Sequence, residues 1–139
     1  MNTQQQGIVD ALKARMSVIA GLVTVTKNRP PEESYGLNQL PAVNVAAIGS
    51  EVIREHAAGT DERLTVVLSV FCAGGTAQDT ALDYLASVLA QIGTDETVGG
   101  LVLGCRKEKR VTTSIKAEFL TAEAHQEITL DYRTPRWGI

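Results

Sequence analysis

The segment 64–71 constrains the fold of this chain more than any other part of its sequence. Side chains on a β-strand point to alternate faces with a period of two residues. One face of this segment would carry Leu64, Val66, Leu68 and Val70, and the other Thr65, Val67, Ser69 and Phe71. Because both faces are fairly apolar, the pattern predicts a central strand that is covered on both sides. The rest of the chain must then supply a sheet around it.

A second strand-like run precedes it. Pro41 opens a strand over 42–48 that could extend to Ile53, and the tract 57–61 contains glycine, threonine and aspartate, which favour a turn. Two strand-like runs joined by such a turn predict an antiparallel hairpin.

Two segments have helical spacing. The first, 4–20, carries an apolar stripe, and Gly21 follows it. The second begins near Thr76, where Thr76 and Asp79 resemble a capping pair, and ends at Gly93. Its apolar residues at spacings of three and four, which predict the face that packs on a sheet, are Leu82, Leu85, Leu89 and Ile92.

The remaining strands are predicted over 22–26, 101–113 and 121–133, with 114–120 ambiguous because a turn is needed there. The order is α-β-β-β-α-β-β. It predicts the α+β class, with a mainly antiparallel, mixed sheet of about four or five strands packed by two helices. We expect one domain over 1–139, with a short C-terminal extension at 135–139.

Composition narrows the class of protein. Hydrophobic residues make up 44% and charged residues 21% of the chain, which is typical of a globular protein rather than a disordered or membrane protein. The polar start of the chain does not fit a signal peptide, so we expect a cytoplasmic origin. The net charge of −3 weakens a general case for nucleic-acid binding. Cys72 and Cys105 are expected to be buried thiols, although two cysteines alone do not exclude a disulfide.

No pattern of an enzyme is present. The sequence lacks a Gly-x-Ser-x-Gly motif, and neither glycine pair, 74–75 or 99–100, belongs to a phosphate-binding pattern. His125 is expected to be a solvated residue on the polar face of the last strand, and His56 lies next to a turn. We therefore expect no catalytic residues, no cofactor and no metal ligands.

One charge cluster stands out at 106–110. It contains four cations in five residues, namely Arg106, Lys107, Lys109 and Arg110. One interpretation is a solvated edge that discourages aggregation between sheet edges. The other is a contact surface for an acidic partner or for nucleic acid. On a strand, only about half of the cluster could face one partner.

The only tryptophan, Trp137, stands almost at the terminus. Pro135 cannot donate to a sheet ladder, so the last strand should end before it. Trp137 either folds back on its own domain or anchors a contact with another protein. With Arg133 and Arg136, it completes the set of candidate interface residues.

Several short motifs resemble the tail terminator proteins of long-tailed bacteriophages, the minor tail protein U-like family. They are the helical start, the Arg-Pro loop, the Leu-Pro-Ala-Val-Asn-Val segment at 40–45, the Gly-Gly-Leu-Val-Leu segment at 99–103 and the final Leu-Asp-Tyr-Arg-Thr strand. The resemblance spans nearly the whole chain but does not include 136–139.

The resemblance implies a homo-hexameric ring in the virion, at the head-proximal end of the tail, assembled in the host cytoplasm. Such a ring ends growth of the tail tube and offers a surface to head-completion or neck proteins. Its partners would be itself, the major tail tube protein and a neck protein, with no membrane. DNA in the tail lumen is a further partner that the basic cluster could contact.

Other functions stay open at this point. The chain could be another head–tail connector or neck protein. A non-enzymatic RNA-binding module would need aromatic side chains exposed on a sheet face. A small hydrolase or isomerase would need a deep pocket with a strongly perturbed acid.

Overall fold

The structure is a computed structural model that describes residues 2–30, 35–108, 112–116 and 121–135. Its helices are α1 (Thr3–Met16) and α2 (Ala77–Gly93), with a short 3-10 helix, η1 (Leu37–Gln39). Its strands are β1 (Thr24–Lys27), β2 (Ala42–His56), β3 (Gly59–Ala73), β4 (Gly104–Lys107), β5 (Thr112–Lys116) and β6 (Thr121–Thr134).

The strands form one mixed sheet in the order β1-β2-β3-β6-β4, with β5 also paired to β6. Only β1 and β2 run parallel, and every other described pair is antiparallel. The α+β class and the predicted order of elements are confirmed. The predicted strand 101–113 is instead divided into β4 and β5. Gly99 and Gly100 have positive φ, and the Val102 N–H donates to the Thr97 carbonyl. A turn therefore occupies the start of the predicted strand, and β4 begins only at Gly104.

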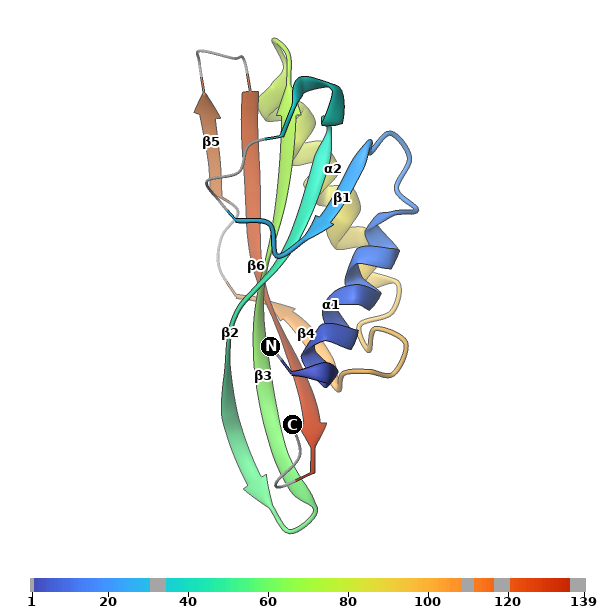
Figure 1. The fold of residues 1–139 in the computed structure, drawn as a ribbon, viewed down its shortest axis with the longest axis vertical. Coiled ribbons are helices and arrows are strands. Elements are labelled where there is room, and N and C mark those ends of the chain that lie inside the picture. The colour runs from blue at the N-terminus through green and yellow to red at the C-terminus, as the bar shows by residue number, and fades with distance from the viewer. Residues whose placement is uncertain (1, 31–34, 109–111, 117–120, 136–139) are drawn as a thin grey trace.

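Strand β3 is the centre of the sheet. It pairs with β2 from Ala42↔Phe71 to His56↔Gly59, and with β6 from Thr60↔Thr134 to Ala73↔Thr121. One of its two faces is buried in the core with residues of both helices. The side chains of this face are Leu64, Val66, Leu68 and Val70. The opposite face, which we call the open face, is partly covered by the loop between β1 and β2 (Figure 1). The prediction of helical cover on one face is therefore correct, whereas the second face has only loop cover.

Helix α1 is shorter than predicted. Asn2 caps it through the Gln5 N–H, and the helix ends at Met16 rather than at residue 20. The chain then turns through Gly21, which has a φ of +89°. A Cβ on Gly21 would lie 2.3 Å from the Tyr84 hydroxyl, so this turn requires glycine.

Helix α2 packs with a face that agrees only in part with the predicted one, because Leu85 and Ile92 are buried but Leu82 is not. Its buried side chains are Ala77, Ala81, Leu85, Val88 and Ile92. Leu89 is half-buried and Leu82 is 37% exposed. Thr76 is the N-cap residue, but its side chain makes no capping bond, and its hydroxyl instead lies 3.4 Å from that of Thr80.

The β2–β3 hairpin is longer than predicted. Strand β2 continues to His56, and the turn occupies only residues 57–58. In Figure 1, the far end of this hairpin extends beyond α1. We call Gly49–His56 of β2 and Gly59–Arg63 of β3 the arm. Bulges at Ile48 and Ile53 interrupt the register of β2 on either side of residues 49–52.

We expect three Leu→Ala substitutions in α2 to rank by burial. Leu85→Ala should lower the free energy of unfolding by about 2–5 kcal/mol, because Leu85 is only 1% exposed and its removal leaves a cavity. Leu89→Ala should cost less, and the exposed Leu82→Ala least. Chemical denaturation of the three variants measures this order, and equal effects at Leu82 and Leu85 would contradict the packing of α2.

Candidate interaction surfaces

The candidate interface residues lie in separate places. Arg106 and Lys107 form the second half of β4, and Arg133 lies next to the end of β6. The other four candidates, Lys109, Arg110, Arg136 and Trp137, fall outside the residues that the structure describes.

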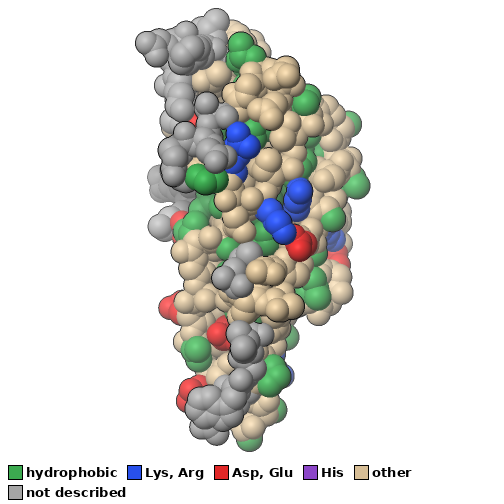
Figure 2. Space-filling model, viewed as in Figure 1, with side chains coloured by type: hydrophobic (Ala, Val, Ile, Leu, Met, Phe, Trp, Pro, Cys, Tyr) green, Lys and Arg blue, Asp and Glu red, His purple; other side chains and the backbone are tan. Residues whose placement is uncertain are grey.

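The described part of the basic cluster is divided between the two faces of the sheet. Arg106 lies opposite Thr129 on the open face, whereas Lys107 lies opposite Ile128, whose side chain belongs to the core face. The Arg106 guanidinium is 3.4 Å from the Glu108 carboxylate, which also accepts from the Thr129 hydroxyl at 2.9 Å. On the face that Figure 2 shows, Lys and Arg side chains are few and no broad basic patch is visible.

Arg133 holds the end of the arm. Its Nε donates to Asp61 Oδ1 at 2.8 Å, and His56 Nε2 lies 3.2 Å from the same oxygen. The hydrogen bond from Arg133, followed by that from His56, lowers the pKa of Asp61 to about 2. The neighbouring Gly59 must stay small, because a Cβ there would lie 2.2 Å from the Thr134 carbonyl oxygen. Arg133 therefore has a structural role in addition to its predicted place at an interface.

A second ion pair follows one rung further along the same two strands. Arg63 donates to Asp131 through Nε at 2.8 Å and through Nη2 at 3.2 Å. The two rungs have opposite orientation, because the cation is on β6 in one and on β3 in the other. The sequence did not reveal these pairs, since they depend on the register between strands that are about 70 residues apart.

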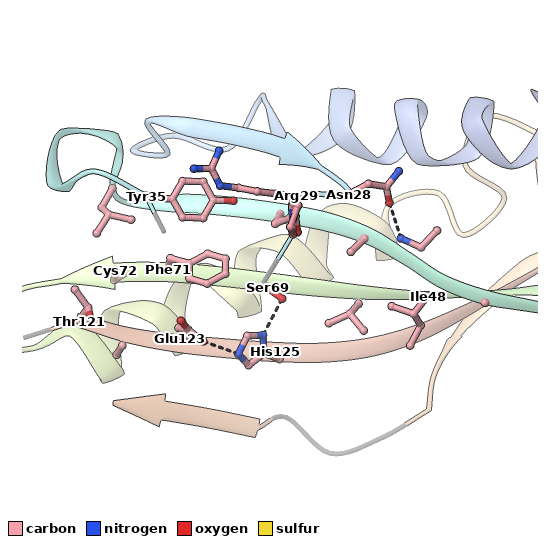
Figure 3. A pocket seen from close by; sticks show the side chains of 18 of the residues that line it. Asn28, Arg29, Tyr35, Ile48, Ser69, Phe71, Cys72, Thr121, Glu123 and His125 are labelled. Carbon is pink, nitrogen blue, oxygen red and sulfur yellow. Dashed lines mark hydrogen bonds and ion pairs between the residues drawn. The ribbon is translucent and has the colours of Figure 1, made fainter. Parts of the chain in front are cut away.

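A large hollow occupies the other half of the open face (Figure 3). Its volume is about 1070 Å³, and it lies between the β1–β2 loop and strands β2, β3 and β6. Tyr35 from the loop reaches over Phe71, with ring centroids 4.9 Å apart, and the Arg29 guanidinium lies 4.3 Å from the Tyr35 centroid. The Thr26 and Tyr35 hydroxyls are 2.7 Å apart, which fixes the loop against β1.

A polar line crosses the floor of this hollow. His125 lies between Ser69 and Glu123, with its Nδ1 2.7 Å from the Ser69 hydroxyl and its Nε2 3.2 Å from the Glu123 carboxylate (Figure 3). A neutral imidazole protonated on Nε2 would donate to Glu123 and accept from Ser69. The predicted solvated histidine is thus part of a hydrogen-bonded row. Sequence alternation could have suggested that these polar residues share a face, but not that Ser69 and His125 are cross-strand partners.

This row resembles the order of groups in a serine hydrolase but lacks its oxyanion site. Strand β3 pairs with both neighbours at this point, with Ser69 opposite both Asn44 and His125. The backbone N–H groups around Ser69 therefore belong to the sheet ladders, whereas acyl transfer needs donors directed at the developing oxyanion. The row joins β3 to β6 through the contact between Ser69 and His125.

Cys72 and Cys105 are free thiols; burial raises the pKa of Cys72 to about 11 and also raises that of Cys105. No three His, Cys, Asp or Glu side chains of the described ranges are grouped to hold a metal ion. Neither helix in this part of the chain is long and apolar enough to cross a membrane.

Comparison with known proteins shows a likeness of fold. The chain is similar to a chain in the solved structure of the virion of a native gene transfer agent (GTA) particle, with a TM-score of 0.53 and 12% sequence identity. The similarity covers 96% of this chain and 100% of that one. No protein-family model and no curated protein sequence matches the chain.

We expect the Asp61 cluster to make the stability of the protein depend on pH. Because Asp61 has a lower pKa in the folded state than in the unfolded state, the unfolded state binds more protons between about pH 4 and pH 2. This contribution should be fully present above pH 4 and be lost as the pH falls toward 2. Denaturation at a series of pH values should show the loss in the parent and a smaller loss in Asp61→Asn. Equal pH dependence in both proteins would contradict the cluster.

Proposed function

We propose that this chain is a structural protein of a tailed phage or phage-like particle, and that it forms a six-subunit ring that caps the tail tube. The observation that carries the proposal is the fold shared with a GTA virion chain over nearly the full length of both chains. The order of motifs along the sequence supports the finer assignment to a tail terminator. In this role the ring ends tube growth and provides the docking surface for a head-completion or neck protein.

The surfaces of the protein are compatible with assembly. Large apolar side chains are exposed along β2 and in the loop before β4, namely Ile48, Val52, Ile53, Leu101 and Leu103. Together with the hollow on the open face, they are the kind of surface that protein contacts cover. Another head–tail connector or neck protein would present similar surfaces and is the nearest alternative.

Two other functions are less well supported. For RNA binding, aromatic rings would need to be available for stacking on a sheet face. Tyr132 is instead fully buried, and Phe71 packs against Tyr35 beside the acidic Glu123. For an enzyme, the Ser69–His125 row lacks oxyanion donors, because the backbone around Ser69 is paired with both neighbouring strands.

The proposal predicts that the protein binds one end of tail tubes as a six-fold ring. We expect electron microscopy of tubes incubated with the purified protein to show one ring at one end, and tubes assembled in its presence to stop growing. Mass measurement of the protein alone should give a monomer or a hexamer. A stable dimer that does not bind tubes would exclude the tail terminator role.

The terminal segment gives a separate test of the ring. We propose that Trp137 is buried in the assembled particle, against an adjacent subunit or a neighbouring ring. Removal of 135–139 should then leave the thermal midpoint of the monomer nearly unchanged but weaken ring formation or docking. Tryptophan fluorescence should shift to the blue on assembly. An emission that is already blue-shifted in the monomer, and does not change, would show that Trp137 packs on its own domain.

A further inference from the structure

Two edge segments of the sheet, residues 49–56 of β2 and strand β4, carry opposite charges at one place. On the side of β2 that faces away from β3, β1 pairs with it only over Ala42–Val45, and no described strand lies on that side from Gly49 to His56. At the other edge segment, β4 pairs with β6, and no second strand is paired with it among the residues that the structure places. Between its two bulges, the first edge carries the exposed Glu51, and Arg54 and Glu55 follow beyond the second bulge. The second edge carries Arg106 and Lys107, also exposed, and Glu108 follows them.

The backbone of the β4 edge is directed toward a further strand, and β2 offers a stretch of matching length. The Glu108 N–H donates to the Glu127 carbonyl at 3.1 Å, so residue 108 faces β6. Because the direction of backbone groups alternates along a strand, those of Cys105 and Lys107 point away from β6. On β2, the stretch between the two bulges is the four residues Gly49, Ser50, Glu51 and Val52. It has the same length as β4.

We propose that β4 of one copy pairs antiparallel with residues 49–52 of β2 in the next copy of the ring. In the register that places Arg106 opposite Glu51, Cys105 lies opposite Val52 and Lys107 lies opposite Ser50. Arg106 and Glu51 are both on the open face, since their partners within the subunit are Thr129 and Arg63. Opposite charges in cross-strand positions stabilise such a pair.

The apolar side of this pair also matches. Val52 is 54% exposed in the isolated subunit, and Cys105 is half-buried. Their side chains would meet on the face that carries the core. A long exposed edge with apolar residues is a site for pairing with another chain unless something covers it. The two bulges limit that pairing to one short stretch and so define its register.

The proposal rests on the proposed ring but adds its interface. Disulfide cross-linking tests it, with Val52→Cys as the probe and the native Cys105 as its partner. Cross-strand neighbours have Cα atoms about 4.5–5.5 Å apart, which lies within the range of a disulfide. Within one subunit, β2 and β4 are separated by β3 and β6, about 14 Å in all, so an internal bond cannot form.

Mild oxidation of Val52→Cys rings should give a ladder of covalent oligomers up to the hexamer on a non-reducing gel. Glu51→Cys is the matched control, because residue 51 points to the opposite face, and it should give little or no ladder. Addition of Cys105→Ser to Val52→Cys should abolish the ladder. Equal cross-linking from positions 51 and 52 would indicate random collision and overturn the pairing.

A charge exchange provides a second measurement. Glu51→Arg and Arg106→Glu should each lower the fraction of protein assembled, and the double variant should recover it. Rings that form on tubes without the Val52–Cys105 bond would overturn the pairing and leave the proposed function standing. The bond without any binding to tubes would leave the pairing standing and overturn the tail terminator role.

Discussion

The structure depends on the pairing of β3 with both of its neighbours along nearly its whole length. All but one of its fifteen residues have a partner on β6, and β2 follows it from the other side with only two bulges. The two ladders provide hydrogen-bond partners for the backbone N–H and C=O groups of β3 in the middle of the protein. It also divides the side chains of three long strands into two faces, so that one register determines both the core and the polar surface.

The core face and the open face are covered differently because of how the strands are connected. Most strand connections leave the open face uncovered, and both helices pack on the core face. The parallel pair β1–β2 would normally be joined by a crossing helix. Here the connection is a loop with one 3-10 turn, held by Tyr35 on Phe71. A loop cannot cover the sheet as a helix would, and the hollow remains beneath it.

The fold was largely predictable from the sequence because burial leaves a periodic pattern. Alternation at 64–71 indicated the central strand, and helical spacing located α1 and α2. The buried face of α2 was less predictable. Its leucines suggested Leu82 and Leu89, but Ala77 and Ala81 face the core instead. Small side chains let the helix approach the sheet closely, and this depends on packing that no single segment encodes. The Ser69–His125 and Arg63–Asp131 contacts were unpredictable for a related reason, since each depends on the exact register of β3 and β6.

The distribution of charge explains why unlike edges should meet. A symmetric contact centred on these residues would place Glu51 close to another Glu51 at two β2 edges, and Arg106 close to another Arg106 at two β4 edges. Like charges at a strand pair are destabilising.

The two edges also run in opposite directions, because β2 is parallel to β6 and β6 is antiparallel to β4. If neighbouring copies of the ring are related by a rotation about an axis close to the strand direction, the direction of each strand is unchanged from copy to copy. The β4 strand of one copy is then antiparallel to the β2 strand of the next. Unlike edges give head-to-tail contacts, which build a ring when the rotation closes, whereas like edges would give a two-fold dimer.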